Sequence, residues 1–397
     1  MPEPASRRTF RTVRRTLAVL VLLYLFLAAI GLLGEGLGLF GQGFADQLIA
    51  TTCDPIVGLF VGILVTSIIQ SSSVTTSMIV AAVGNGTIPI ACAVPMVMGA
   101  NIGTTVTSLL VSFSCVRRRE EFRRALACAT VHDFFNMLTV IILLPTELLT
   151  RVITRTHVGY LEYVGSKLAE FLAGTASLGS FDSPIKAACE PLVKLITGGI
   201  TALTASLFGE ESGKGIASPI AATIIVVLAV LLILWTLFTI VQILRRSSAD
   251  RLGVLFDRFI GTGGVIGLLL GFVVTLAVQS SSMVLSLCVP MAAAGIITID
   301  QIFAVTLGAN IGTTGTAILA ALGTGSVAGL AIAFAHTLFN TTGVLIFFPI
   351  KPMRRLPIGM ALWFSRIASE SRWIAVLYLI IMFFVLPLTC VLIGRLL

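Results

Sequence analysis

Two polar motifs occur twice in this chain, in the same order each time. Gln-Ser-Ser-Ser occupies residues 70–73 and 279–282, and Gly-Ala-Asn-Ile-Gly-Thr-Thr occupies residues 99–105 and 308–314, so both motifs recur after 209 residues. Serine hydroxyls and backbone N–H groups donate hydrogen bonds to an oxyanion, whereas amide and hydroxyl oxygens can ligate a hard monovalent cation. Two buried polar clusters are costly unless they act together, so the duplication predicts one binding site built from both copies.

The repeat extends beyond these motifs on both sides. Upstream residues recur at the same offset, and a downstream set recurs after 204 residues. The matching pairs are Gly58 with Gly267, Gly62 with Gly271, Thr66 with Thr275, His132 with His336, Phe135 with Phe339, Asn136 with Asn340 and Pro145 with Pro349. Glycines four residues apart allow close approach of helices. We interpret the paired histidines as helix-packing or gate residues.

The composition indicates a membrane protein. Hydrophobic residues make up 57% of the 397 residues and charged residues 11%, and the mean hydropathy is +1.05. Several stretches are long enough to cross a hydrocarbon core of about 30 Å as helices. The clearest are Thr16–Leu33, Ala125–Leu144, Pro219–Leu244, Ser326–Ile350 and Trp373–Ile393. The first follows a basic arm, as in a signal peptide, but it is too long and lacks a cleavage site, so we interpret it as a retained span.

The distribution of positive charge predicts the topology. Of the 26 Lys and Arg residues, 19 fall in four groups, at 7–15, 117–124, 245–258 and 351–372. The positive-inside rule places these groups in the cytoplasm and the central segment outside. The first Gln-Ser-Ser-Ser motif then follows an external connection and the second follows a cytoplasmic one. The two copies therefore have opposite orientations, which is the inverted-topology repeat of many secondary transporters.

We therefore expect an all-α polytopic membrane protein with six segments. They are a basic cytoplasmic arm (1–15), a first transmembrane repeat (16–146), an external connector with interfacial helices (147–218), a second transmembrane repeat (219–350), a basic helix on the cytoplasmic surface of the membrane (351–372) and a C-terminal span (373–397). Short amphipathic stretches such as Lys186–Ile200 lie in the connector. We expect the protein in the cell (inner) membrane, with its N-terminus in the cytoplasm and its C-terminus outside.

The serine runs predict interrupted helices. Three consecutive serines cannot all face one side of a continuous helix, because successive residues turn by about 100°. Consecutive polar residues at mid-membrane are typical of a break or re-entrant hairpin, where the freed backbone groups line a cavity enclosed by protein. We therefore expect re-entrant or broken helices with the Gln-Ser-Ser-Ser motifs at their tips. The alternative is that these serines only hydrogen-bond to carbonyls of their own helix. That alternative would not explain why the serine run occurs twice, each time at the same distance from the Gly-Ala-Asn-Ile-Gly-Thr-Thr motif.

Asp133 is a carboxylate inside an apolar stretch, and its counterpart in the second copy is Thr337. An intramembrane carboxylate costs at least a few kcal/mol, so a functional role is the default expectation. Asn136 lies one helical turn further and is a candidate co-ligand for a cation. The alternative is a structural hydrogen bond or ion pair with His132 or with a neighbouring helix.

The paired motifs resemble those of the type II sodium-dependent phosphate cotransporter family. The stretches FRRALACATVHDFFNMLTV, ACEPLVKLI, GIITIDQIF and RWIAVLYLII also resemble family sequence, so the resemblance covers about residues 54–387. The chain departs from the family pattern in two ways. Its central connector is short and lacks the paired cysteines of animal members, and the last family span is missing after 373–393.

This resemblance implies electrogenic symport of inorganic phosphate with sodium, both bound near mid-membrane between the two Gln-Ser-Ser-Ser units. The implied phosphate ligands are Gln70, Ser71, Ser72, Ser73, Gln279, Ser280, Ser281 and Ser282. The implied sodium ligands are Gln279, Ser280, Asn310, Thr313 and Thr316 at one site, and Gln70, Ser71, Asn101, Thr104 and Thr107 at a symmetry-related site. Ala127, Ala129 and Asp133 match the spacing of members that bind an extra sodium, which adds Asp133 with Asn136. Sodium is then a co-transported ion, and we expect no organic cofactor.

We keep two alternatives: transport of another oxyanion or a passive anion pathway on the same fold, and, more remotely, an intramembrane enzyme. The sequence lacks the HExxH motif, paired intramembrane acids and Ser–Lys geometry that such an enzyme would use. The Gly-Ala-Asn-Ile-Gly-Thr-Thr motif resembles no nucleotide-binding pattern, and the basic residues flank spans, so neither a nucleotide nor a nucleic acid is expected. The seven cysteines are scattered singly, and we interpret them as small buried hydrophobes.

Overall fold

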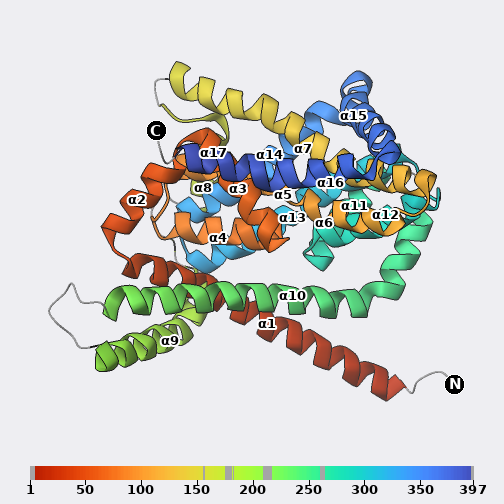
Figure 1. Cartoon of the computed structure of the whole chain (residues 1–397). Coiled ribbons are helices and arrows are strands. Elements are labelled where there is room, and N and C mark those ends of the chain that lie inside the picture. Colours follow the sequence, from red (N-terminus) through yellow and green to blue (C-terminus); the bar gives the residue numbers. More distant parts are fainter. Residues whose placement is uncertain are drawn as a thin grey trace.

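The computed structural model describes residues 5–154, 157–174, 181, 183–208, 217–259 and 264–394, with only the backbone described in 5–12, 217–218 and 245–259. The regular elements in these ranges are helices, as the sequence predicts (Figure 1). In chain order they are α1 (Ala5–Leu39), α2 (Gln42–Thr52), α3 (Pro55–Ile69), α4 (Ser72–Gly84), α5 (Ile90–Gly103), α6 (Thr105–Ser112), η1 (Phe113–Cys115), α7 (Arg119–Ile153), α8 (Tyr160–Ala173), α9 (Pro184–Phe208), α10 (Ala217–Phe259), α11 (Gly264–Val278), α12 (Ser281–Ala293), α13 (Ile299–Thr324), α14 (Val327–Phe347), α15 (Lys351–Glu370), α16 (Arg372–Ile380), the π-helical turn η3 (Ile381–Val385) and α17 (Leu386–Gly394).

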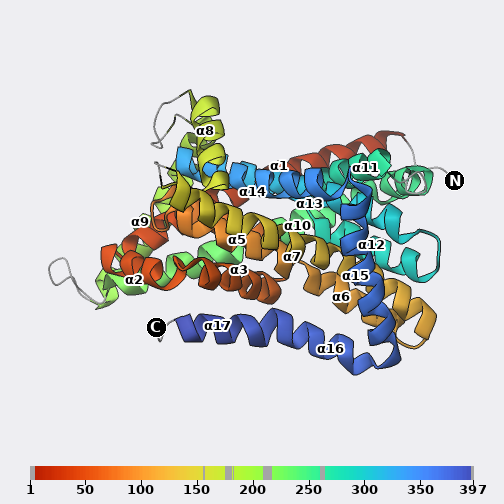
Figure 2. The same cartoon turned by 90° about the horizontal axis from the view of Figure 1, so that it is seen from above.

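Most long helices run along a common direction, and α15 lies across them at one end of the molecule (Figures 1 and 2). Eight helices in the described residues are long and apolar enough to cross a membrane, and α2 with α3, bent by 99° at their junction, would make a ninth. Four of the five spans predicted from the sequence fall within these helices, and the fifth, 326–350, extends beyond α14 by one residue at its start and three at its end. The expectation of an all-α polytopic membrane protein is therefore confirmed.

The central segment differs from the expectation. The stretch Lys186–Ile200 is not a short amphipathic element but part of α9, a continuous helix of 25 residues. This helix is long and apolar enough to be a span, and it packs against α1 and α10. The physical reason is that the second half of its outer face is also apolar, since Leu203 and Leu207 are exposed. The charged Glu190 and Lys194 lie in its first half. Residues 155–156, 175–180, 182 and 209–216 of the predicted connector lie outside the described residues.

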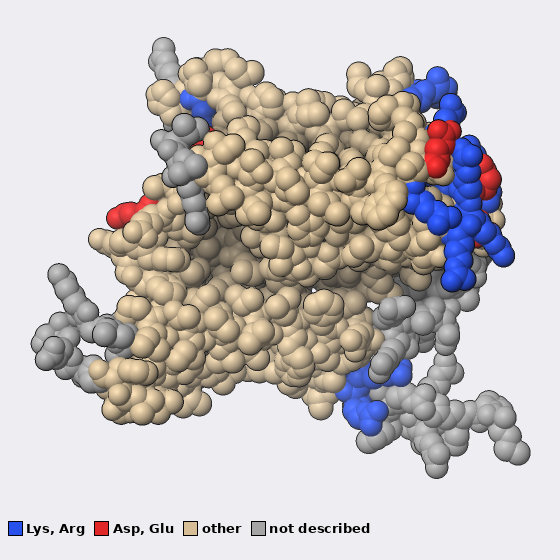
Figure 3. Space-filling view, viewed as in Figure 1, with Lys and Arg blue, Asp and Glu red and all other residues tan. Residues whose placement is uncertain are grey.

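Charged side chains are confined to the ends of the molecule on the face shown in Figure 3. Lys and Arg gather at the end where α15 lies, and the long middle of that face carries almost no charge. The predicted basic helix at 351–372 corresponds to α15. The side chains of residues 7–11 and 245–258, and the chain end at 395–397, lie outside the described residues.

Helices α3 and α5 approach each other to backbone contact. A Cβ atom added at Gly62 would lie 2.0 Å from Met96 O, and one added at Gly99 would lie 1.9 Å from Leu59 O. Cβ atoms do not approach other atoms this closely, so only glycine fits at either position. The predicted role of the paired glycines in close helix packing is confirmed here.

The second copy repeats this contact between α11 and α13. A Cβ atom added at Gly271 would lie 2.0 Å from Val305 O, and one at Gly308 would lie 1.8 Å from Leu268 O. These four positions follow the 209-residue offset from the first copy. The repeat in the sequence is therefore also a repeat in helix packing.

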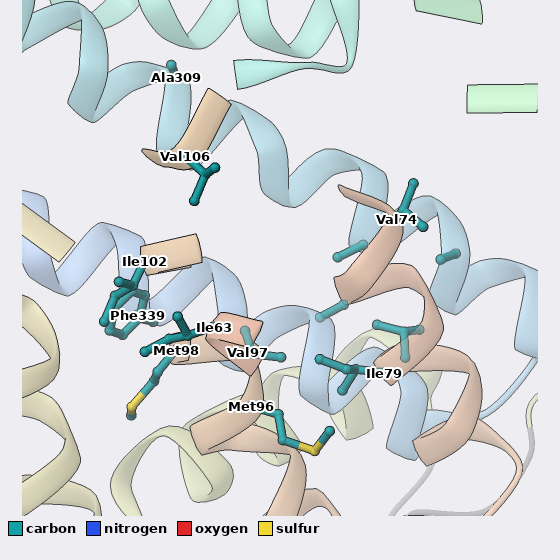
Figure 4. Packing of buried hydrophobic residues seen from close by; sticks show 14 of the residues in the cluster. Ile63, Val74, Ile79, Met96, Val97, Met98, Ile102, Val106, Ala309 and Phe339 are labelled. Carbon is teal, nitrogen blue, oxygen red and sulfur yellow. The ribbon is translucent and has the colours of Figure 1, made fainter. Parts of the chain in front are cut away.

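A single hydrophobic core joins the two copies. Figure 4 shows part of it, with Ile63 of α3, Ile79 of α4 and Ile102 of α5 from the first copy. Phe339 of α14 and Ala309 of α13, from the second copy, belong to the same cluster (Figure 4). Helix α4 contacts α13 and α14, while α12 contacts α6 and α7, so each short helix packs against the other repeat.

The expectation that all seven cysteines are isolated buried hydrophobes is wrong for two of them. Cys53 and Cys92 form a disulfide across 39 residues of sequence. The sharp bend between α2 and α3 brings Cys53 beside the first turn of α5, and sequence spacing does not show this bend. Cys128, Cys189 and Cys288 are free and buried, as expected.

The glycine contact leads to a stability prediction. Gly308→Ala places a methyl group against Leu268 O, so the helices must separate, and we expect the free energy of unfolding to fall by about 3 kcal/mol, near the upper end of overpacking costs. The midpoint of thermal unfolding in detergent measures this. Gly359→Ala is the control, since a Cβ atom there meets nothing within 4 Å, and it should leave the midpoint unchanged or raise it. Equal midpoints for the two variants would contradict the close contact.

Candidate functional site

The first Gln-Ser-Ser-Ser motif interrupts a helix. After α3, Gln70 adopts the left-handed conformation with φ of 62°. Its backbone N–H donates to Thr66 O at 2.7 Å and its side-chain amide donates to Ser67 O at 2.7 Å, which satisfies two carbonyls at the helix end. Ser71 then caps α4, because its Oγ accepts a hydrogen bond from Val74 N at 3.4 Å.

The second motif has the same geometry between α11 and α12. Gln279 has φ of 60°, its N–H donates to Thr275 O at 2.6 Å, and its side-chain amide donates to Leu276 O at 2.6 Å. Ser280 Oγ accepts from Met283 N at 3.3 Å. A positive φ is uncommon for residues other than glycine. The predicted helix break at both motifs is confirmed, and the same contacts build it twice.

A cavity of about 430 Å³ lies between the two tips. All eight residues of the two motifs line it, together with Val74, Thr107, Leu237, Phe238, Val241, Gln242, Met283, Ser286 and Leu287. Ser73 Oγ donates to Gln279 O at 3.5 Å, which links the tips directly. The structure thus brings together every residue that the sequence predicts as a phosphate ligand.

Among the described residues, the cavity offers hydrogen-bond donors but no charged side chain. The hydroxyl groups of Ser72, Ser281 and Ser282 line it, and none of the three has a hydrogen-bond partner among the residues that the structure describes. The first turns of α4 and α12 also face the cavity, and a helix N-terminus carries roughly half a positive charge. The lining residues that the structure describes include no Lys, Arg or His. The arrangement suits an oxyanion, but neutralises only about half of a dianion.

The glutamine of each tip also contacts a threonine that was predicted as a sodium ligand. Thr107 Oγ1 donates to Gln70 Oε1 at 3.0 Å, and Thr316 Oγ1 donates to Gln279 Oε1 at 2.6 Å. Each pair places two uncharged oxygens side by side next to the tip. Oxygens of this kind ligate hard cations.

The other predicted threonine ligands bond within their own helices. Thr104 Oγ1 donates to Ala100 O at 3.1 Å, and Thr313 Oγ1 donates to Ala309 O at 3.0 Å. Neither residue lines the cavity. Their oxygens still have a free lone pair each, since a hydroxyl donor keeps its acceptor capacity.

The predicted asparagine ligands lie in a second polar network, away from the cavity lining. His336 Nε2 and Asn340 Nδ2 each lie 3.3 Å from Asn101 Oδ1. His132 Nε2 lies 2.8 Å from Asn310 Oδ1. Each asparagine therefore bonds to the histidine of the other repeat. This pairing supports the interpretation of the histidines as helix-packing residues.

The network is not symmetric, because Asn136 occupies its centre. Asn136 Nδ2 donates to Asn101 O at 3.1 Å, and its Oδ1 accepts from Asn310 Nδ2 at 2.9 Å. In the other repeat, Asn340 Oδ1 and His336 Nδ1 are buried and have no partner in the described part of the chain. The two halves share residue types but differ in how fully they are hydrogen-bonded.

Asp133 is fully buried in α7 and bonds away from this network. The hydroxyl of Tyr378, from α16, donates to Asp133 Oδ2. Asp133 Oδ1 has no partner among the described residues. Asn136 bonds into the asparagine–histidine network instead, so the structure does not pair it with Asp133 as we expected.

Sequence reasoning missed several of these polar contacts. Tyr378 is the partner of Asp133, Thr105 Oγ1 lies 2.9 Å from His132 Nδ1, and Gln242 of α10 lines the cavity. Tyr378 and Gln242 share one signal, a single polar group inside a long apolar helix, which in a membrane protein is costly without a partner.

Comparison with known proteins agrees with this geometry. The sequence matches the Na+/Pi-cotransporter family over residues 25–146 and 232–369. It is 33% identical to sodium-dependent phosphate transport protein 2B of Homo sapiens, over 96% of this chain and 65% of that protein. It is 32% identical to sodium-dependent phosphate transport protein 2A of Ovis aries, over 97% of this chain and 69% of that protein, and 33% identical to the 2A protein of Rattus norvegicus over the same shares.

The chain thus spans about 65% of the length of the human 2B protein, and no solved structure matches it. Both copies of the paired motifs, and hence the whole lining contributed by the two tips, fall within the matched ranges. The chain belongs to the Na+/Pi-cotransporter family.

Proposed function

We propose that this protein is a sodium-coupled symporter of inorganic phosphate, with the anion bound in the cavity between the two Gln-Ser-Ser-Ser tips. The observation that carries the proposal is that two helix N-termini and a set of unpartnered serine hydroxyls meet in one cavity. Family membership supports it, as do the names of the relatives, which are sodium-dependent phosphate transport proteins.

Coupling to a cation follows from the charge of the cavity. Two helix N-termini supply together about one positive charge, and the described lining residues contain no cationic side chain. A dianionic phosphate therefore remains undercompensated in a site of low dielectric, where uncompensated charge is costly. Sodium ions at the Gln70–Thr107 and Gln279–Thr316 oxygens would supply the missing charge. The anion and the cations then stabilise each other, which makes their transport interdependent.

Asp133 is the proposed ligand of a further sodium ion. Its Oδ1 has no partner in the described residues, and its Oδ2 accepts from a neutral tyrosine hydroxyl. The carboxylate is thus without a counter-charge in its surroundings, which suits a cation site. A third sodium ion moving with dianionic phosphate makes each cycle carry one positive charge inward.

We also propose that the two repeats are inverted in the membrane. The α3–α4 hairpin lies toward the end of the molecule that carries α2, and the α11–α12 hairpin lies toward the end that carries α15 (Figures 1 and 2). The arginines gather at the α15 end (Figure 3), so the positive-inside rule supports a cytoplasmic location for that end. The N-terminus would then be cytoplasmic and the C-terminus external.

A passive pathway, or transport of another oxyanion, is the competing function. Phosphate uptake into proteoliposomes that does not change when the sodium gradient is removed would favour that alternative. Uptake that requires the gradient would favour symport.

Removal of the serine donors tests the anion site. Ser72→Ala together with Ser281→Ala deletes two charge-assisted hydrogen bonds worth about 1.5–3 kcal/mol each, so sodium-dependent uptake should fall at least a hundredfold at low phosphate. Ser77→Ala is the control, since its hydroxyl on the same helix donates to Ser73 O at 2.7 Å and the residue does not line this cavity. Normal uptake by a folded double variant would exclude this location for phosphate.

Labelling of single cysteines tests the topology. The labelling uses a variant in which the native free cysteines are replaced. In this variant, Arg118→Cys should react only with a thiol reagent added on the cytoplasmic side, and Lys167→Cys only with a thiol reagent added outside, since both native side chains are exposed. Reaction of both positions from the same side would contradict the proposed orientation.

A membrane potential tests the role of Asp133. One net charge gains about 2.3 kcal/mol per 100 mV, so an inside-negative potential should stimulate wild-type uptake. Asp133→Gly should abolish the stimulation while some electroneutral transport remains. Tyr378→Phe keeps the carboxylate and removes only the hydroxyl, so it should retain the stimulation. If a potential set with valinomycin does not change wild-type uptake, the proposal that Asp133 binds a sodium ion is wrong, and its role is structural.

A further inference from the structure

A second cavity, of about 420 Å³, lies at the α15 end of the molecule. It is formed where the start of α7, the turn between α12 and α13, and α15 meet. Three arginines line it, Arg123 and Arg124 from α7 and Arg366 from α15. Figure 3 shows the wider basic surface at this end. The cavity is separate from the central one, with which it shares no lining residue.

Among the described residues, only one of these three arginines is paired with a carboxylate. Glu120 pairs with Arg123 at 2.9 Å. The other two glutamates at this end are engaged outside the cavity, Glu121 with Arg118 at 2.7 Å and Glu370 with Arg119 at 3.1 Å.

Arg124 and Arg366 have no ion-pair partner among the described residues. Asp300, in the first turn of α13, is not among the lining residues. Within the described part of the chain, two guanidinium groups therefore line the cavity without a counter-charge, while Glu120, Glu121 and Glu370 are already paired.

The turn between α12 and α13 is shaped around one of these groups. Gly295 has φ of 75°, and a Cβ atom added there would lie 2.9 Å from Arg124 Nη1. Glycine thus leaves room for the guanidinium at the cavity wall. Thr298 and Ser365 add hydroxyl groups to the lining, and Ile297, Ile299, Ile302 and Leu362 add apolar surface.

We propose that this cavity binds a phosphate-bearing anion. The planar guanidinium group binds phosphate oxygens in a bidentate manner, and two of them without a counter-charge match an anion of one or two charges. The phosphate could belong to inorganic phosphate or to the headgroup of an anionic phospholipid, whose chains would lie on the apolar part of the lining. The bound anion would contact the C-terminal end of α12 and the N-terminal end of α13, and these two helices carry the second copy of both polar motifs.

Binding measurements with matched charge variants test the site. Arg124→Gln/Arg366→Gln removes both unpaired groups. Arg117→Gln/Arg355→Gln removes two positive charges from exposed residues at the same end that do not line the cavity. One arm titrates purified protein with radiolabelled inorganic phosphate without sodium. The other counts bound phosphatidylglycerol, with phosphatidylcholine as reference, by native mass spectrometry.

The cavity pair should weaken binding at least tenfold in one arm, while the control pair changes it less than twofold. The phosphate arm or the lipid arm then identifies the source of the anion. Equal effects of the two pairs, or no effect of the cavity pair in either arm, would overturn the site and leave the arginines as ordinary surface charge. If the cavity pair does not fold, Arg366→Gln against Arg355→Gln on the same helix gives the same comparison. Both arms measure binding, so their outcome is independent of whether the protein transports phosphate.

Discussion

A helix that ends inside an apolar bundle leaves backbone groups that water cannot reach, and the rest of this structure depends on how those groups are satisfied. At each break the glutamine turns its backbone into the left-handed region, and its side-chain amide donates to a carbonyl of the helix that has just ended. The serine that follows caps the next helix. The remaining serines are thereby free to face the cavity. One tetrapeptide thus ends one helix, begins another and supplies the donors of the site.

The two helix breaks can form one cavity only because the packing of the helices holds the two tips at a defined separation. Glycines bring the helix before each tip into backbone contact with the helix that carries the second motif. The resulting position of Gln70 and Gln279 places their Oε1 atoms within hydrogen-bonding distance of Thr107 and Thr316. Larger residues at the glycine positions would move the tip and the proposed cation oxygens together. The geometry of the polar site therefore depends directly on the close packing of the hydrophobic helices.

The spans, the helix breaks and the meeting of the two motifs could be predicted from the sequence, because each depends on local pattern or on repetition. The exchange of partners between repeats could not. Asn101 and Asn310 belong to the same repeats as the cavity residues, yet they bond to His336 and His132 on helices that only tertiary packing brings near. Tyr378 was missed for the same reason, since its partner is 245 residues away in sequence. The extent of α9 was missed because the exposed face of its second half is apolar, whereas the stretch 186–200 begins with exposed charged residues.

The disulfide between Cys53 and Cys92 has a consequence for the two ends of the molecule. Disulfides persist in oxidising compartments and are rare in the reducing cytosol. The bond lies at the α2 end, whereas Cys115, beside the arginines of the opposite end, is a partly exposed free thiol. Cys390, in α17 beside α3, is also a partly exposed free thiol, so the disulfide and not the free thiols distinguishes the two ends among the described residues. A disulfide at the α2 end is compatible with an oxidising outer compartment on that side, and it therefore supports the same proposed direction of insertion as the arginines do.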